Sequence, residues 1–154
     1  MTSENNKSKL DVAARRAARL GAVQATYQMD LGGTPSEEII DEFVEHRLGQ
    51  ELEGDLYNEA DVEHFTALIR GVVNDQVRID RTIEDGLAEG WTMTRIDSTL
   101  RAILRCGIYE LINMTEIPAA VIVNEYIDLS KAFFEGPEPK FVNGLMDRIA
   151  RAVR

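Results

Sequence analysis

Five basic side chains near the start of the chain could bind phosphate groups. They share one short segment and are Lys7, Lys9, Arg15, Arg16 and Arg19. Arg15 and Arg19 lie four residues apart, so they share a face if the segment is helical. A cation in the first turn of a helix opposes the helix dipole at a cost of about 0.3–1 kcal/mol, whereas an arginine fork binds phosphate oxygens through paired hydrogen bonds. We therefore predict nucleic-acid contact here, with a solvated helix start as the alternative.

A second candidate site follows a proline-rich turn near the other end of the chain. The turn reads GPEP over residues 136–139, and KFVNG follows over residues 140–144. Lys140 supplies a cation, Phe141 a ring that could stack on a base, and the helix start free amide groups for a phosphate. On the residues alone, the better supported alternative is that Phe141 anchors the last helix in the core.

Few residues could support catalysis or hold a metal. A di-iron bundle needs two Glu-x-x-His motifs and two further inward glutamates, and the chain offers one loose pair, Asp61 and His64. Cys106 as a nucleophile needs a nearby histidine base, and both histidines, His46 and His64, fall in the acidic half of the chain. Gly32-Gly33-Thr34 lacks the lysine of a phosphate-binding loop. We expect no enzyme activity, no cofactor and no metal.

Helices have to position the candidate residues, because alternating strand patterns are absent. A length of 154 residues fits about one domain, which we place over residues 9–154 after a disordered polar arm over residues 1–8. The predicted fold class is all-α. Capping boxes, prolines and apolar spacing predict seven helices, over residues 8–29, 34–48, 61–78, 80–88, 97–114, 118–134 and 140–154.

The helix over residues 97–114 is predicted to be the central, most buried one. Its apolar residues recur every three or four positions and form a wide stripe: Leu100, Ile103, Leu104, Ile108, Leu111 and Ile112. Such a stripe must be covered on several sides. Arg101, Arg105 and Glu110 are then expected to mark the strip that reaches water or a partner.

One acidic segment carries the whole net charge of −10. The segment from Glu37 to Glu63 holds 11 acidic residues and one base, Arg47, which leaves 16 acids and 16 bases elsewhere out of 27 and 17. The remainder can hold a local basic patch, so the acidic balance does not exclude RNA binding. The segment itself is read as a solvated face, or as a surface that repels RNA or receives a basic protein.

The sequence also predicts where the protein works. Its one cysteine, Cys106, fits a reducing cytosol. The N-terminus lacks the apolar stretch of a secretory signal, and no segment approaches the ~18 apolar residues of a membrane span. We expect a cytoplasmic protein that makes no membrane contact.

Four stretches of the chain resemble the NusB transcription antitermination family. They are ARRAARLGAVQATYQ (14–28), LRAILRCGIYEL (100–111), IPAAVIVNEYIDLSKAF (117–133) and KFVNGLMDRIA (140–150). The last three are specific in this order and spacing, whereas only the helical character agrees over residues 31–75. The resemblance implies an all-helical fold of two small packed helical bundles, and no enzymatic activity.

The resemblance also implies partners and contact residues. NusB-like proteins bind the boxA element of leader RNA, mainly in ribosomal RNA operons. They do so together with NusE, a small-subunit ribosomal protein, and help an RNA polymerase complex to read through terminators. The family's RNA contacts map to the arginines of the first helix, to Tyr27, and to Lys140 and Phe141. Ala17 stands where many members continue the arginine run, so this basic patch is thinner.

Geometry decides whether these elements can act together. If the helices that begin near residues 8 and 140 start on the same side, their cations form one surface with about three to five phosphate contacts. NusE should then dock elsewhere, and we expect it around Arg95, Asp97 and Arg101. Some relatives self-associate, so a homodimer is also open.

Two other functions fit the same residues. A NusB-like domain also occurs in RNA cytosine methyltransferases, which continue into a cofactor-binding half. Because this chain runs only to Arg154 and has one cysteine, we expect descent from such a domain at most, without catalysis. The second alternative is a protein-only scaffold that uses the acidic face.

Overall fold

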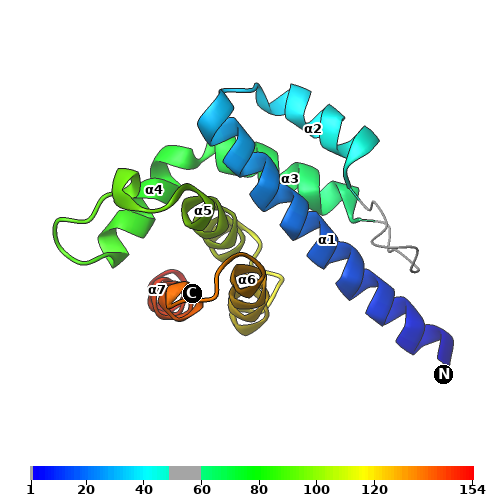
Figure 1. Cartoon of the computed structure of the whole chain (residues 1–154). Helices are drawn as coiled ribbons and strands as arrows, with labels where there is room; N and C mark the ends of the chain where they lie inside the picture. Colours follow the sequence, from blue (N-terminus) through cyan, green and yellow to red (C-terminus); the bar gives the residue numbers. More distant parts are fainter. Residues whose placement is uncertain (1, 49–59) are drawn as a thin grey trace. The chain divides into compact units, whose positions relative to one another are not determined.

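The computed structural model describes residues 2–48 and 60–154, and side chains from residue 11 onward. These residues form seven α-helices, one 3-10 turn and no strand (Figure 1), which confirms the all-α prediction. The elements are α1 Thr2–Gly32, α2 Ser36–His46, α3 Val62–Asn74, α4 Gln76–Gly86, the 3-10 turn η1 Met93–Arg95, α5 Ser98–Asn113, α6 Ala119–Phe133 and α7 Glu138–Val153. Two compact units are present, residues 1–70 and residues 71–154.

Small residues on α1 let the helices of the first unit pack closely. Ala18, Ala22 and Ala25 are fully buried. Gly21 faces α3, because a Cβ atom there would lie 3.5 Å from the ring of Phe65. That ring stacks on Phe43 of α2 with centroids 5.7 Å apart. These small residues therefore form the packing face of α1.

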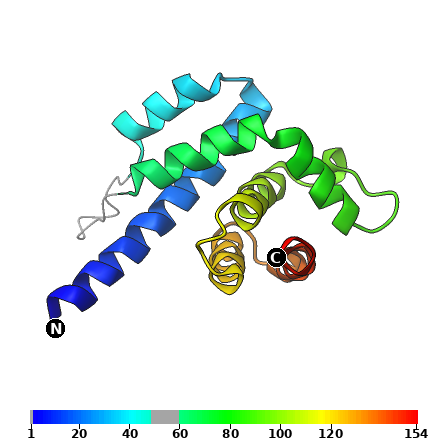
Figure 2. The same ribbon diagram turned by 180° about the vertical axis from the view of Figure 1, so that it is seen from behind.

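Helix α5 is the centre of the second unit, as predicted. Helices α4, α6 and α7 all pack against it, and Figure 2 shows α5, α6 and α7 grouped as a bundle. Its N-cap is Asp97, whose Oδ2 accepts hydrogen bonds from the amides of Thr99 (2.9 Å) and Leu100 (3.2 Å). The cap satisfies amides that have no partner within the helix. The predicted range, 97–114, differs from the observed helix, Ser98–Asn113, by one residue at each end.

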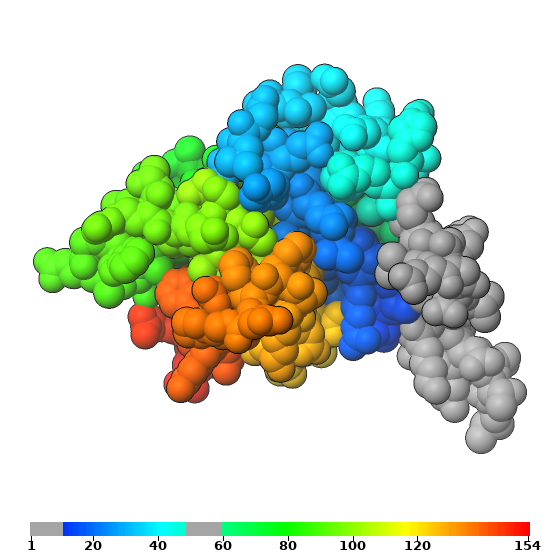
Figure 3. Space-filling view, in the orientation of Figure 1, coloured from blue at the N-terminus to red at the C-terminus, as the bar shows by residue number. Residues whose placement is uncertain are grey.

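The chain between α4 and α5 lies beside the start of α7 on the surface of the second unit. In Figure 3 the light green segment around residues 87–97 adjoins the orange segment around residues 137–141. Both segments line one pocket. This places residues far apart in the sequence within reach of a single ligand.

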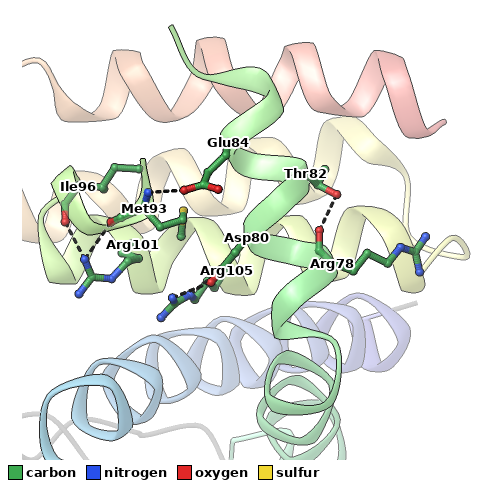
Figure 4. A network of polar contacts seen from close by, with 8 residues as sticks. All are labelled: Arg78, Asp80, Thr82, Glu84, Met93, Ile96, Arg101 and Arg105. Atoms are coloured by element: carbon green, nitrogen blue, oxygen red, sulfur yellow. Dashed lines mark hydrogen bonds and ion pairs between the residues drawn. The ribbon is translucent and has the colours of Figure 1, made fainter. Parts of the chain in front are cut away.

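The prediction that three polar residues of α5 reach water or a partner is wrong for two of them. Arg105 and Glu110 are buried. Arg105 donates from Nε and Nη2 to both carboxylate oxygens of Asp80 on α4, each at 2.9 Å (Figure 4), and Glu110 accepts from the hydroxyl of Tyr126 on α6. Burial of these charged groups is tolerated because helices distant in sequence supply the partners.

Several predicted helix ends also differ. Helix α1 begins at Thr2, so residues 2–8 are helical where a disordered arm was expected; they contain neither Gly nor Pro to stop a helix. Helix α2 begins at Ser36 with Pro35 as its N-cap, two residues after the predicted start. The break between α3 and α4 falls at Asp75. Helix α7 begins before Pro139, because proline in a first turn loses no intrahelical hydrogen bond.

Replacing Gly71 by alanine should destabilise the protein. A Cβ atom there would lie 2.0–2.3 Å from Cζ, Cε1 and Oη of Tyr109, a rigid ring. We expect a loss of about 1–3 kcal/mol in the free energy of unfolding by urea, although alanine is the better helix former. Gly144→Ala is the control, since no atom of the described residues lies within 4 Å of a Cβ atom there. Equal effects of the two substitutions would contradict this packing.

Stability should also fall in strongly alkaline solution through Tyr109. Burial, and then the negative charge of Asp75, raise the pKa of this phenol above its ordinary value. The unfolded chain then loses the proton more readily than the folded one, so the contribution is complete below pH ~10 and is lost as pH rises through the folded pKa. Urea titrations across pH 9–11 should show this fall, and Tyr109→Phe should reduce it.

Candidate nucleic-acid interface

The basic start of α1 meets the end of the acidic segment. Arg15 is about half exposed, and its Nε lies 3.6 Å from Oδ2 of Asp61. Asp61 also accepts from the amide of His64 at 2.9 Å, which caps α3, and its own amide donates to the carbonyl of Ala14 at 3.0 Å. A residue that the sequence assigned to a repelling or solvated surface therefore holds one of the predicted RNA-binding arginines.

The other basic residues near the start of α1 differ in how exposed their side chains are. Arg16 is exposed. Arg19 is only 3% exposed, which contradicts its predicted place on an RNA-binding surface. It shares the buried side of α1 with Ala18 and Ala22, a position that its basic character did not reveal. The side chains of Lys7 and Lys9 lie outside the described residues, and their RNA contacts stay predictions.

Tyr27 lies on the surface of the first unit beside other polar groups. Its ring is exposed and borders a pocket of about 450 Å³ that Gln24, Gln28 and Arg47 also line. Arg47 donates from Nη1 to Oε1 of Gln28 at 3.2 Å and stacks over the ring of Phe43 at 4.3 Å. An exposed ring flanked by amides and a guanidinium can stack on a base and hydrogen-bond its edge.

Phe141 does not anchor α7, so the alternative favoured from its residue type is wrong. Its ring is 39% exposed, while Val142, Leu145 and Ile149 supply the buried face of the helix. Lys140 is exposed in the same turn. A cation and an available ring thus stand side by side at the start of α7.

Two of the three residues predicted to dock NusE, Arg95 and Asp97, line the same pocket as Phe141. Arg95 donates from Nη1 to the carbonyl of Gly90 at 3.2 Å and lies over the ring of Trp91 at 5.3 Å. Asp97 caps α5, and Arg101 donates to the carbonyls of Met93 and Ile96 at 3.0 Å each (Figure 4). Asp97 and Arg101 therefore hold the start of α5 in place, and protein docking at these three residues stays a prediction.

Sequence reasoning missed two residues that shape these surfaces. Asp61 was treated as part of an acidic segment and as one member of a loose pair with His64, and Trp91 fell in the gap between two predicted helices. The available signal for Trp91 was a large ring directly after a glycine in a polar turn, where no helical stripe could bury it. Gly90 does adopt a positive φ of 89°, and Trp91 is exposed.

Removing the negative charge of Asp61 should strengthen RNA binding. Asparagine caps a helix as well as aspartate does, so Asp61→Asn keeps the start of α3 while it frees Arg15 from a competing carboxylate. An exposed ion pair is worth about 0.2–1 kcal/mol, so we expect up to about fivefold tighter binding in an RNA titration. Glu63→Gln is the control, because it makes the same charge change at an exposed neighbour. An equal gain in both variants would show that only net charge matters.

Two negative findings apply to the described residues alone. Within them, no group of three or more His, Cys, Asp or Glu side chains could hold a metal ion. No helix formed by these residues is both long enough and apolar enough to cross a membrane.

Comparison with known proteins identifies the family. The model of the NusB family matches residues 16–151. The transcription antitermination protein NusB of Allorhizobium ampelinum is 51% identical over 155 residues, covering 100% of this chain and 97% of that protein. The solved structure of T. maritima NusB has a TM-score of 0.76 at 30% identity, and covers 89% of this chain and 90% of that chain. A structure of antitermination factors NusB and NusE in complex with dsRNA has a TM-score of 0.74 at 28% identity, and the match covers 89% of this chain and 96% of that chain. The chain belongs to the NusB family.

Proposed function

We propose that this protein is a transcription antitermination factor that binds boxA-type single-stranded leader RNA together with NusE. In the cytoplasm, the pair would join an RNA polymerase complex and support read-through of ribosomal RNA operons. The family match supports the role in antitermination. A related structure that contains NusB, NusE and dsRNA supports the two partners.

The observation that carries RNA binding is the exposed pair at the start of α7. Phe141 keeps more than a third of its surface exposed although its neighbour Val142 begins the buried face of α7, and Lys140 beside it is exposed. Stability alone does not require a bare ring at this position. A ring next to a cation is the combination that holds single-stranded nucleic acid, because bases stack and phosphates are neutralised.

The first unit contributes a second element of the same kind. Arg15 and Arg16 offer guanidinium groups, and Tyr27 offers a ring farther along the same helix. So few cations should bind RNA weakly and with a strong dependence on salt. A protein partner that adds its own RNA contacts would raise the affinity, which is the reason to expect NusE in the functional complex.

A gel-shift titration with and without NusE tests the proposal. We expect a boxA-type RNA to bind the NusE complex more tightly than a scrambled RNA of the same composition, and either RNA to bind the isolated protein more weakly. Equal and weak binding of both RNAs to the complex would instead favour a protein-only scaffold. The exposed acids of α2, including Glu37 and Glu38, would then be the surface to examine.

A further inference from the structure

One pocket in the second unit combines two exposed aromatic rings with nearby cations. It has a volume of about 450 Å³, and Trp91 from the loop before α5 and Phe141 from α7 both line it. We propose that this Trp91–Phe141 pocket receives one unstacked base of the bound RNA. The inference rests on the proposed function and adds to it a base-binding subsite that includes Trp91.

The size and lining of the pocket suit a flat ligand. Its volume lies within the usual range of small-molecule sites. Leu87, Ile96 and Leu100 give it an apolar floor. Trp91 is 49% exposed and Phe141 39% exposed, so both rings keep free surface on which a base can stack.

The charges around the pocket favour a base inside and phosphates outside. Asp97 and Glu138 line it, and their carboxylates would repel a phosphate but can accept hydrogen bonds from the amino groups of a base. Arg95 lies over the ring of Trp91, and Lys140 is exposed directly beside Phe141. These two cations can bind the phosphates that flank the inserted nucleotide.

An apolar side chain of a protein partner is the competing occupant. It would use the floor of the pocket, but it would give no reason for two exposed rings accompanied by cations. A nucleotide uses all of these groups together. The observations therefore favour RNA, and occupation by NusE becomes one outcome of the test.

Trp91 is the only tryptophan of the chain, so its fluorescence reports on the pocket directly. Stacking of a base on an indole ring quenches its emission. We expect a single-stranded boxA-type RNA to quench Trp91 saturably, with the same midpoint as a gel shift performed in the same buffer. Because this assignment uses Arg95 for RNA, it opposes the prediction that NusE docks around Arg95 and Asp97, and NusE without RNA should leave the emission largely unchanged.

Two matched substitutions test the second ring. Phe141→Leu should weaken RNA binding about tenfold, since each base that stacks on an aromatic ring adds to the affinity. Phe133→Leu is the control, because Phe133 is also 39% exposed and does not line the pocket. Trp91→Leu should match Phe141→Leu, and circular dichroism checks that the variants are folded.

The outcomes separate this inference from the proposed function. If RNA shifts in the gel but leaves Trp91 emission unchanged and binds Phe141→Leu normally, the pocket is not a base site and RNA binding stands. If NusE alone changes the emission and RNA adds nothing, the pocket docks protein and the inference fails. If no RNA binds with or without NusE, both proposals fail.

Discussion

Reversing the charges of Arg15 and Arg16 together should weaken RNA binding by about 100-fold at moderate salt. Each substitution replaces a phosphate-binding cation with a carboxylate that repels the same phosphate. Two lost phosphate contacts should also lower the slope of log affinity against log salt by about 1.4, given roughly 0.7 per contact for single strands. A filter-binding series of Arg15→Glu/Arg16→Glu across salt concentrations measures both effects.

A matched pair of arginines controls for net charge. Arg78 and Arg81 on α4 are both exposed, and Arg78→Glu/Arg81→Glu changes the charge by the same amount. In the absence of NusE, we expect this control variant to bind RNA with an affinity only slightly below that of the wild type. Binding of NusE to Arg15→Glu/Arg16→Glu should be unchanged. If NusE binding falls together with RNA binding, the arginines support the fold of α1 and are not an RNA contact.

Replacing Arg105 by methionine should lower the free energy of unfolding by about 3 kcal/mol. Removing one partner of a buried ion pair typically costs about 3–5 kcal/mol, because the other charge stays buried without compensation. We expect the lower end of that range, since the side chain of Asp80 keeps 23% of its surface exposed. Urea unfolding of Arg105→Met, followed by far-ultraviolet circular dichroism, gives the value.

The double variant decides whether the cost comes from the isolated carboxylate. Arg105→Met/Asp80→Leu removes both charges and leaves apolar side chains between α4 and α5. Such replacements are often neutral or stabilising, so the double variant should recover most of the loss. If the double variant is no more stable than Arg105→Met, the packing of the arginine stem matters more than its charge.

The prediction for α5 succeeded where the signal was local. A wide apolar stripe identifies a central helix without any knowledge of the neighbours. The same stripe could not reveal that Arg105 is buried, because its partner Asp80 lies 25 residues earlier on another helix. Sequence spacing shows which residues share a face, but the charge that a neighbouring helix brings depends on packing.

In the candidate site, too, some residues could be identified from the sequence, and others only from the tertiary fold. The family resemblance identified Tyr27 and Phe141, and both rings are exposed. Arg19 was misplaced because residue type suggests a surface position, whereas α1 turns this residue toward its buried side. Trp91 and Asp61 were missed because their partners, Phe141 and Arg15, lie about 50 residues away in the chain. Pairs at that separation meet only through the tertiary fold.

The single cysteine has a practical consequence for studying motions of the second unit. Cys106 is fully buried in α5, so a thiol reagent can reach it only when the helices around α5 separate. At low reagent concentration the labelling rate, relative to that of a free thiol, gives the equilibrium constant for that opening. The labelling rate of Cys106 in the wild-type chain thus reports local unfolding of this unit, and any ligand that stabilises the packed helices will lower that rate.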